Sequence, residues 1–195
     1  MSRKAKITRK TKETSISVAV NLDGKGKYKI NTGIGFLDHM INQLAFHALF
    51  DLELNCKGDL YIDQHHTVED IGICLGNSLK NCLGSKKGIQ RYGFSYIPMD
   101  EALLRVVIDC SGRAEFIFHG AFKNYKIGSL ESQMIPHFFK SLAFSAGITL
   151  NMNILEGIND HHKAEGLFKG FARALFEAIQ IEPRRTLVSS TKGLL

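Results

Sequence analysis

Residues 157–175 read GINDHHKAEGLFKGFARAL, and this stretch decides how the rest of the chain is interpreted. The adjacent pair His161–His162 and Glu165 stand at the head of a segment whose apolar residues recur with helical spacing. Asn159 or Asp160 is a suitable N-cap for that helix. Imidazole and carboxylate groups are common ligands of transition metals. The stretch therefore predicts a helix that carries three metal-capable side chains.

The same pattern occurs a second time in the chain. The HHxxE motif of residues 161–165 recurs at residues 65–69, again ahead of apolar residues with helical spacing. When His39 is aligned with His137, a Leu-Ala-Phe triplet follows each histidine at the same distance, and the two HHxxE motifs coincide after a short gap. Agreement in both spacing and residue identity indicates an internal duplication.

The duplication predicts two half-domains that each run hairpin, helix, strand pair and helix. The predicted fold class is α+β, and the repeats cover about 9–83 and 100–180 within a single domain of residues 1–195. The predicted elements of the first half are a hairpin of 14–22 with 28–30, helices at 36–50 and 65–83, and strands at 51–56 and directly before His65. Those of the second half are a hairpin of 102–110 with 114–120, helices at 132–148 and 160–180, and a strand at 149–154, with residues 84–100 as a connector.

The composition is that of an ordinary globular protein. The chain has 195 residues, of which 44% are hydrophobic and 23% are charged. A chain of this length is able to form a hydrophobic core that needs no disulfide bonds or structural metal to stabilise it. No apolar run approaches the roughly 20 residues that span a bilayer, so no membrane partner is expected. The cysteines show no CxxC spacing and are interpreted as buried, reduced thiols, which suits a cytoplasmic protein; they are Cys56, Cys74, Cys82 and Cys110.

The formal net charge is +6, and the N-terminal stretch MSRKAKITRKTK is rich in lysine and arginine and contains no acid. A basic arm of this kind can bind nucleic acid. A short run without interleaved aromatic residues is more typical of a solvated terminus. A third interpretation is a site for a small anionic substrate, because phosphate requires only a few well-placed cations.

Six of the eight histidines occupy equivalent positions in the two repeats. Within HHxxE, the first histidine lies one helical turn before the glutamate and shares its face of the helix. The second histidine diverges from the first by about 100° around the helix, so the two are poorly placed to bind one ion. The six imidazoles and two carboxylates therefore predict two sites of four protein ligands, drawn from both halves of the fold or from neighbouring subunits.

Histidine and carboxylate ligands without thiolate favour Mn, Fe, Zn, Co or Ni over Ca or Mg. Four protein ligands on a six-coordinate metal leave positions for a substrate, which indicates catalysis. Four basic residues are candidates for binding an anionic ligand beside the metals. Lys169 follows Glu165 by one helical turn, and the other three are Arg91, Arg113 and Lys192. Each alone is more typical of a solvated surface charge. Together they are able to clamp a phosphate. No Walker-type or GxGxxG loop is present, so a nucleotide is not indicated.

Eight stretches between residue 9 and the C-terminus complete the pattern: RKTKETSI, GIGFLDHM, GDLYIDQHHTVEDIGICLG, GIQRYG, PMDEAL, SGR, HHKAEGLFKGFARAL and SSTKGLL. With these stretches the chain resembles the imidazoleglycerol-phosphate dehydratases over nearly its whole length. The resemblance implies a fold similar to the second domain of ribosomal protein S5, with helices packed between β-sheets. It also implies a large homo-oligomer, an octahedral particle of twenty-four subunits, with active sites at subunit interfaces.

The resemblance further implies a cofactor and a set of site residues. The cofactor is Mn2+, with two ions per active site. The implied metal ligands are His39, His65, His66, Glu69, His137, His161, His162 and Glu165. The implied substrate-binding residues are Glu13, Arg91, Arg113, Lys169 and Lys192.

The implied reaction is loss of water from D-erythro-imidazole glycerol phosphate, which gives imidazole acetol phosphate in histidine biosynthesis and makes the protein a hydro-lyase. The proton to be removed lies beside the ring, with no carbonyl group to acidify it. Two Lewis-acidic ions are able to hold the ring as an imidazolate, from which the hydroxyl group leaves through a diazafulvene-like intermediate. We expect Glu13 to be the catalytic acid/base, because a free carboxylate near two dications is able to move the proton. The alternative interpretation of Glu13 is an exposed glutamate in a basic tail.

Two other functional classes compete with this one. A di-metal phosphohydrolase would use the same side chains to activate water, but such sites usually share carboxylates between ions about 3.5–4 Å apart, and each motif here holds one glutamate. A nucleic-acid-binding module would explain the basic N-terminus and leave the duplicated ligands unexplained. We therefore expect a small phosphorylated imidazole as substrate, self-association, and no nucleic-acid partner.

Overall fold

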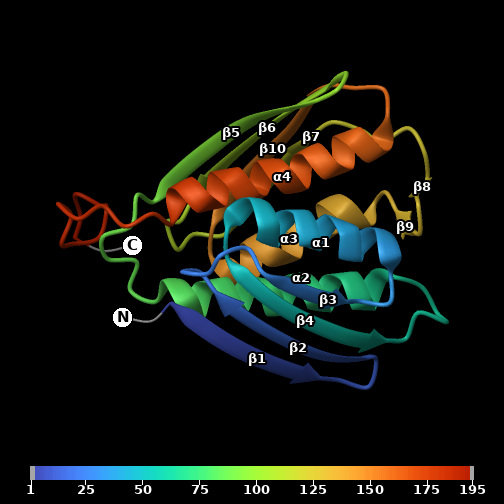
Figure 1. Ribbon diagram of the computed structural model, residues 1–195, viewed down its shortest axis with the longest axis horizontal. Helices are drawn as coiled ribbons and strands as arrows, with labels where there is room; N and C mark the ends of the chain where they lie inside the picture. Colours follow the sequence, from blue (N-terminus) through green and yellow to red (C-terminus); the bar gives the residue numbers. More distant parts are fainter. Residues whose placement is uncertain (1–2, 194–195) are drawn as a thin grey trace.

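Within residues 3–193, two four-stranded sheets enclose four helices (Figure 1). The computed structural model describes residues 3–193. The first half contains β1 (Lys4–Lys10), β2 (Thr14–Asn21), β3 (Tyr28–Asn31), α1 (Gly35–Ala48), β4 (Asp51–Gly58) and α2 (His65–Leu83). The second half contains β5 (Tyr92–Met99), β6 (Ala102–Asp109), β7 (Glu115–His119), the small hairpin of β8 (Lys126–Ile127) and β9 (Leu130–Glu131), α3 (Met134–Ala146), β10 (Thr149–Glu156) and α4 (Asp160–Ala178).

The two sheets share one topology. Their strand orders are β1-β2-β4-β3 and β5-β6-β10-β7. In each sheet the first two strands form an antiparallel hairpin, and the third strand of the half pairs in parallel with the strand that follows the next helix. The predicted α+β fold of duplicated half-domains, with helices between sheets, is thus confirmed. The secondary structure of the halves spans Lys4–Leu83 and Tyr92–Ala178, and the repeat bounds of about 9–83 and 100–180 stay a prediction.

The helices form a layer to which both halves contribute. α1 and α2 lie on the first sheet, and α3 and α4 lie on the second (Figure 1). Within the layer α1 packs against α4 and α2 packs against α3. The second contact is close, because a Cβ on Gly72 would lie 2.8 Å from the carbonyl oxygen of Phe138, and one on Gly76 would lie 2.5 Å from that of Leu142. Glycine at these positions of α2 therefore sets the spacing of the two helices.

The core of the layer is aromatic where α3 faces α4. Phe138, Phe139, Phe168 and Phe171 are fully buried, and the rings of Phe139 and Phe168 lie 4.6 Å apart. Burial of each such side chain contributes about 1.5–3 kcal/mol to folding. The helical periodicity of both segments thus places their apolar faces against each other. Within residues 3–193, no helix is both long and apolar enough to cross a membrane.

Both predicted hairpins are wrong in their pairing. β2 pairs with β1 and β4, whereas β3 lies at the far edge of the sheet, parallel to β4. Likewise β6 pairs with β5 and β10, and β7 lies parallel to β10. Alternation of apolar and polar residues identifies a strand but not its partner. The parallel pairs form because α1 and α3 supply the long crossover that such pairs require.

The predicted connector at 84–100 is also wrong, because it contains β5. The inward-facing residues of this strand are Gly93 and Ser95, and its large apolar residues, such as Tyr92 and Phe94, face outward. The small inward residues let α4 approach closely: a Cβ on Gly93 would lie 1.9 Å from the carbonyl oxygen of Ala174. The alternation does not reveal the strand, because the two buried positions of its inner face are glycine and serine and its aromatic residues face outward.

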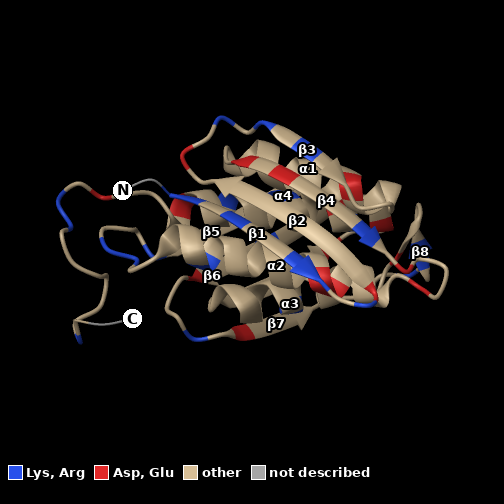
Figure 2. Ribbon diagram, turned by 90° about the horizontal axis from the view of Figure 1, so that it is seen from below, with Lys and Arg blue, Asp and Glu red and all other residues tan. Residues whose placement is uncertain are grey.

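The basic N-terminal stretch is an edge strand and not a loose arm. Residues Lys4–Lys10 form β1, which pairs with β2 along its whole length. Its lysines are exposed, while Ala5 and Ile7 pack against the core. The basic residues of β1 are the blue segments of that strand in Figure 2. The short strand predicted directly before His65 is wrong, because residues 59–64 form turns.

We expect Gly76→Ala to destabilise the fold. The added methyl group would meet the carbonyl oxygen of Leu142 at 2.5 Å and Cβ of Ser145 at 2.8 Å. The helices must then separate, at a cost of about 1–3 kcal/mol. Urea denaturation of the metal-free protein measures the loss. Gly35→Ala is the matched control, because the nearest atom to its methyl group is the Ser129 hydroxyl at 3.9 Å. Equal free energies of unfolding for the two variants would contradict this account.

Candidate functional site

Two groups of metal-capable side chains lie in the helical layer. The first, here called the α1–α4 cluster, consists of His39 on α1 and of His161 and Glu165 on α4. The Oε2 atom of Glu165 lies 3.2 Å from Nε2 of His39 and 3.0 Å from Nε2 of His161. One ligand atom from each of the three residues lies within 4.8 Å of the others. A single ion is able to bridge atoms at this spacing.

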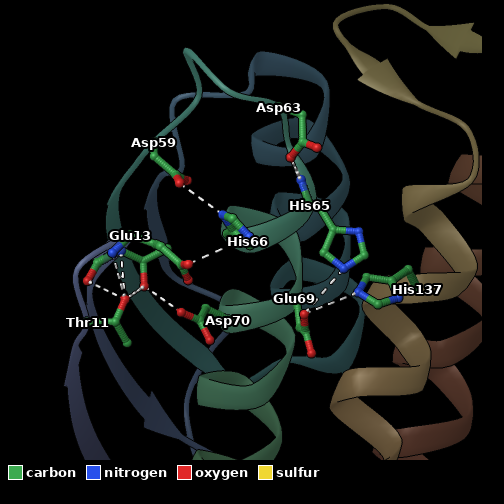
Figure 3. A network of polar contacts seen from close by, with 10 residues as sticks. Thr11, Glu13, Asp59, Asp63, His65, His66, Glu69, Asp70 and His137 are labelled. Carbon is green, nitrogen blue, oxygen red and sulfur yellow. Dashed lines mark hydrogen bonds and ion pairs between the residues drawn. The ribbon is translucent and has the colours of Figure 1, made fainter.

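The second group, here called the α2–α3 cluster, consists of His65 and Glu69 on α2 and His137 on α3 (Figure 3). The Oε2 atom of Glu69 lies 3.5 Å from Nε2 of His65 and 3.7 Å from Nε2 of His137. The Nε2 atom of His137 is buried and has no hydrogen-bond partner among the described residues. Burial and the neighbouring His65 lower the pKa of His137, which favours the neutral ring that binds metals.

Each cluster combines the two halves of the chain. A histidine and a glutamate one turn apart on α2 or α4 meet a histidine from a helix of the other half. The glycines of α2 contribute directly, because Gly72 allows the turn that carries His137 to approach the turn that carries Glu69. The cluster geometry therefore depends on the same close packing that stabilises the helical layer.

His66 and His162 lie outside both clusters. His66 points away from His65 (Figure 3), and its Nδ1 lies 2.9 Å from Oδ2 of Asp59. Nδ1 of His162 lies 2.7 Å from Oε2 of Glu101. These hydrogen bonds raise the pKa of each imidazole. The two histidines of each motif thus face different surroundings, as their divergence around a helix requires.

The head of α4 is fixed by local contacts. The side chain of Asn159 accepts a hydrogen bond from the N–H of His161, which confirms Asn159 as the N-cap. The buried carboxylate of Asp160 accepts from the backbone of Lys123 and Asn124 and pairs with Lys163 at 2.9 Å. Burial alone raises the pKa of Asp160, but these hydrogen bonds lower it overall. The turn that carries both histidines is therefore held to the loop between β7 and β8.

Lys169 extends the α1–α4 cluster along α4. Its Nζ lies 2.6 Å from Oε1 of Glu165. Burial alone raises the pKa of Glu165, but hydrogen bonds from Lys169, His161 and His39 lower it overall. The carboxylate is therefore ionised, which is the form required of a metal ligand.

Glu13 lies in the turn between β1 and β2, beside His66 (Figure 3). Its Oε1 atom is 3.8 Å from Nε2 of that histidine. The turn is ordered: Thr11 accepts the N–H of Glu13, and the hydroxyl of Thr14 donates to the buried carboxylate of Asp70 on α2. Glu13 is therefore held at the N-terminal end of α2 and does not belong to a loose tail.

The three other basic residues predicted to bind substrate lie together in a cleft away from the clusters. Arg91, Arg113 and Lys192 line an open cleft of about 990 Å³, here called the basic cleft. The buried side chain of Arg91 donates to both carboxylate oxygens of Asp109, at 2.7 and 3.1 Å, and to the carbonyl oxygen of Ser189 at 2.6 Å. The cleft thus presents oriented N–H donors suited to an anion.

The clusters and the basic cleft lie at opposite ends of the protomer. His161 stands at the first turn of α4, and the backbone N–H of Arg91 donates to the carbonyl oxygen of Ala178 at its end. A helix of 19 residues is about 28 Å long. In Figure 1 the C-terminal segment accordingly lies at the end opposite β8 and β9. A single chain therefore does not bring these two groups of residues together.

The sequence interpretation gave no role to three acidic residues near the second histidines. These are Asp59, Asp100 and Glu101, each within 4 Å of a ring nitrogen of His66 or His162. Asp59 lies seven residues before His66, whereas Glu101 lies 61 residues before His162. None of the three belongs to an HHxxE motif, so the spacing of the motifs does not reveal them. Their sequence signals are the stretches GDLYIDQHH, which contains Asp59, and PMDEAL, which contains Asp100 and Glu101.

The chain is similar to known proteins over its whole length. The sequence model of the family described as imidazoleglycerol-phosphate dehydratase matches residues 32–175. An imidazoleglycerol-phosphate dehydratase of Cereibacter sphaeroides is 53% identical over 194 residues, which cover 99% of this chain and 100% of the relative. One of Acetivibrio thermocellus is 51% identical over 195 residues, with full coverage of both.

Solved structures agree with the sequence matches. The crystal structure of the imidazoleglycerol-phosphate dehydratase of Staphylococcus aureus has a TM-score of 0.84 at 35% identity and covers 92% of this chain and 99% of that one. The structure from Pyrococcus furiosus has a TM-score of 0.83 at 33% identity and covers 97% and 100%. The chain therefore belongs to the imidazoleglycerol-phosphate dehydratase family, whose members are hydro-lyases of histidine biosynthesis.

Proposed function

We propose that this protein dehydrates D-erythro-imidazole glycerol phosphate to imidazole acetol phosphate, with two Mn2+ ions in each active site. The observation that carries the proposal is the pair of histidine–glutamate clusters within the helical layer, one between α1 and α4 and one between α2 and α3. Family membership supplies the reaction class.

The residues present fit the proposed metal. Each cluster offers two imidazole nitrogens and one carboxylate, a donor set that suits Mn, Fe or Zn better than Ca or Mg. The buried Nε2 of His137, which lacks a hydrogen-bond partner among the described residues, is free to bind an ion. When bound, the two ions supply Lewis acidity to an imidazole ring that has no carbonyl group to acidify its neighbouring proton.

The fourth protein ligand of each ion is proposed to be His66 or His162. Neither residue belongs to its own helix's cluster, and neither ring is buried in the protomer. Both are therefore available to an ion held by a cluster of a neighbouring subunit. Large apolar residues lie exposed in the turns directly before the two motifs, namely Tyr61, Ile62 and Ile158. Exposed apolar groups beside a site are typical of a surface that another chain covers.

The basic cleft is proposed to hold the substrate phosphate. Arg91, Arg113 and Lys192 there offer several N–H donors to the phosphate oxygens. Because the cleft lies a helix length from the clusters, a substrate of this size cannot touch both within one protomer. The complete active site is therefore proposed to form between subunits, in a large homo-oligomer. Lys169, which pairs with Glu165, is proposed to contact the substrate from the cluster side.

Glu13 is proposed to move the proton. Its carboxylate is half exposed and lies next to His66, and its backbone is fixed by Thr11. A carboxylate so placed is able to accept a proton from the substrate and return it to the product. Arginine and lysine side chains hold the other end of the substrate, so that the reacting carbon is oriented toward Glu13.

The whole chain is proposed to act as one domain built from repeats at about 9–83 and 100–180. A cytoplasmic location is proposed on the basis of the biosynthetic family and of the four buried, unpaired cysteines. Burial raises the pKa of Cys56 to about 12 and that of Cys74 to about 11. These thiols are therefore protonated and unreactive.

We expect the manganese-loaded protein to convert D-erythro-imidazole glycerol phosphate to the ketone product. Mass spectrometry of the reaction mixture measures the loss of one water. Dialysis against a chelator should abolish turnover, and added Mn2+ should restore it, because the ring is not activated without the ions. A metal-free protein with full activity would contradict the proposal. Release of inorganic phosphate would favour a phosphohydrolase instead.

We expect Glu13→Gln to lower kcat by about 10²- to 10⁴-fold, because the amide is unable to exchange the proton. Metal analysis should show an unchanged manganese content, since Glu13 belongs to neither cluster. Glu53→Gln, an exposed change on β4, is the control and should leave kcat unchanged. Turnover retained in Glu13→Gln would remove this residue from the mechanism.

We expect two inactive variants to complement each other. Glu165→Gln damages the α1–α4 cluster, and Arg113→Ala damages the basic cleft. If a site combines the cluster of one subunit with the cleft of another, co-expression creates some intact sites, at random about a quarter of the total. Assay of the co-purified, differently tagged chains measures the recovery. No recovery in mixed particles would place the complete site within one chain.

A further inference from the structure

Both second histidines of the HHxxE motifs are held by a carboxylate at the same ring atom. Oδ2 of Asp59 lies 2.9 Å from Nδ1 of His66 (Figure 3), and Oε2 of Glu101 lies 2.7 Å from Nδ1 of His162. In both cases Nε2 is left on the other side of the ring, toward Glu13 in one half and toward Asp100 in the other.

The two carboxylates do not occupy equivalent positions of the repeat. Asp59 directly follows β4, whereas Glu101 lies in the turn between β5 and β6. The residue that follows β10, and so corresponds to Asp59, is Gly157. The shared contact is therefore not a simple remnant of duplication. Two different loops place a carboxylate at Nδ1 of the second histidine of each motif, His66 in one half and His162 in the other.

The hydrogen bond fixes which nitrogen carries the proton. An ionised carboxylate only accepts, so Nδ1 must donate, and in a neutral imidazole Nε2 is then left with its lone pair. A carboxylate on the second nitrogen of a ligand histidine also fixes the orientation of the ring. His39, His65, His137 and His161 contact a cluster glutamate, whereas His66 and His162 stand outside the clusters and need another means of orientation.

We propose that Asp59 and Glu101 are positioning residues that hold His66 and His162 as Nδ1–H tautomers, with Nε2 presented as the metal ligand to a neighbouring subunit. This inference rests on the ligand roles given to His66 and His162 in the proposed function. It assigns to each outward histidine a carboxylate partner that prepares it for binding before assembly.

The surroundings of the two carboxylates differ in a way that allows a selective test. Oε1 of Glu101 accepts from the backbone N–H groups of Ile158 and Asn159, at 2.9 and 2.7 Å. Oδ1 of Asp59 is buried and has no hydrogen-bond partner among the described residues. A carboxylate-to-amide substitution is therefore fixed in orientation at position 101 and free to turn at position 59.

In Glu101→Gln the side-chain carbonyl oxygen must face the two backbone donors, because the amide NH2 group would repel them. The NH2 group then faces Nδ1 of His162 and donates to it, which moves the ring proton to Nε2. The ligand atom is thereby blocked while the loop contacts are kept. In Asp59→Asn the carbonyl oxygen is able to turn toward Nδ1, so the Nδ1–H tautomer of His66 is retained.

The test is titration of the metal-free assembled protein with Mn2+, with free ion measured by electron paramagnetic resonance. We expect Glu101→Gln to weaken the affinity for one of the two ions by about 10- to 100-fold, close to the effect of His162→Ala. We expect Asp59→Asn to weaken Mn2+ binding by a smaller factor than Glu101→Gln does. Asp59→Ala should weaken Mn2+ binding nearly as much as His66→Ala does. The double variant Glu101→Gln/His162→Ala should bind no more weakly than His162→Ala alone, because Glu101 acts through that ring.

Asp63→Asn is the matched control, because Asp63 accepts from the backbone N–H of His65 and touches no imidazole (Figure 3). Its affinity should stay within about twofold of the wild-type value. Thermal unfolding of each metal-free variant shows whether the chain still folds. Wild-type affinity in Glu101→Gln, or additive losses in the double variant, would overturn the inference. Unchanged affinity in both His66→Ala and His162→Ala would instead overturn the ligand set of the proposed function.

Discussion

Adjacent side chains on an α-helix diverge by about 100°, and the rest of this structure depends on that constraint. At the head of α2 and of α4, the first histidine turns inward to a glutamate one turn below it, and the second turns outward. A single helix therefore presents its two histidines in two different locations. One place is a cluster inside the helical layer, and the other is the surface beside it.

The α1–α4 and α2–α3 clusters are completed by the packing of one half of the chain against the other. α2 meets α3 and α4 meets α1, so each cluster receives its third side chain from the opposite half. Gly72 and Gly76 permit the close approach of α2 to α3, and the buried aromatic residues between α3 and α4 hold the two helices of the second half together. The same contacts that bury apolar surface thus bring the imidazole and carboxylate groups within reach of one ion.

The outward orientation of the second histidines supports the proposal that one chain holds only part of an active site. His66 and His162 are oriented by Asp59 and Glu101 toward the surface, while the basic cleft lies at the other end of α4. Rigid helices and sheets keep these groups apart within one chain. In the proposed function, association of chains brings the metal-binding clusters of one chain together with the phosphate-binding cleft of another, and each chain is left free to fold around an apolar core.

Sequence by itself determined the fold class, the duplication, the helices and the candidate ligands, because helical periodicity and repeated motifs are local properties. Only the tertiary structure decided which strands pair, that β5 is a strand, and that Glu13 belongs to an ordered turn. It also decided how the six histidines divide between clusters and surface, and which carboxylates orient His66 and His162. These are contacts between segments distant in the chain. They follow from the strand pairings that the crossover helices make possible and from close packing at glycine, neither of which leaves a periodic signal.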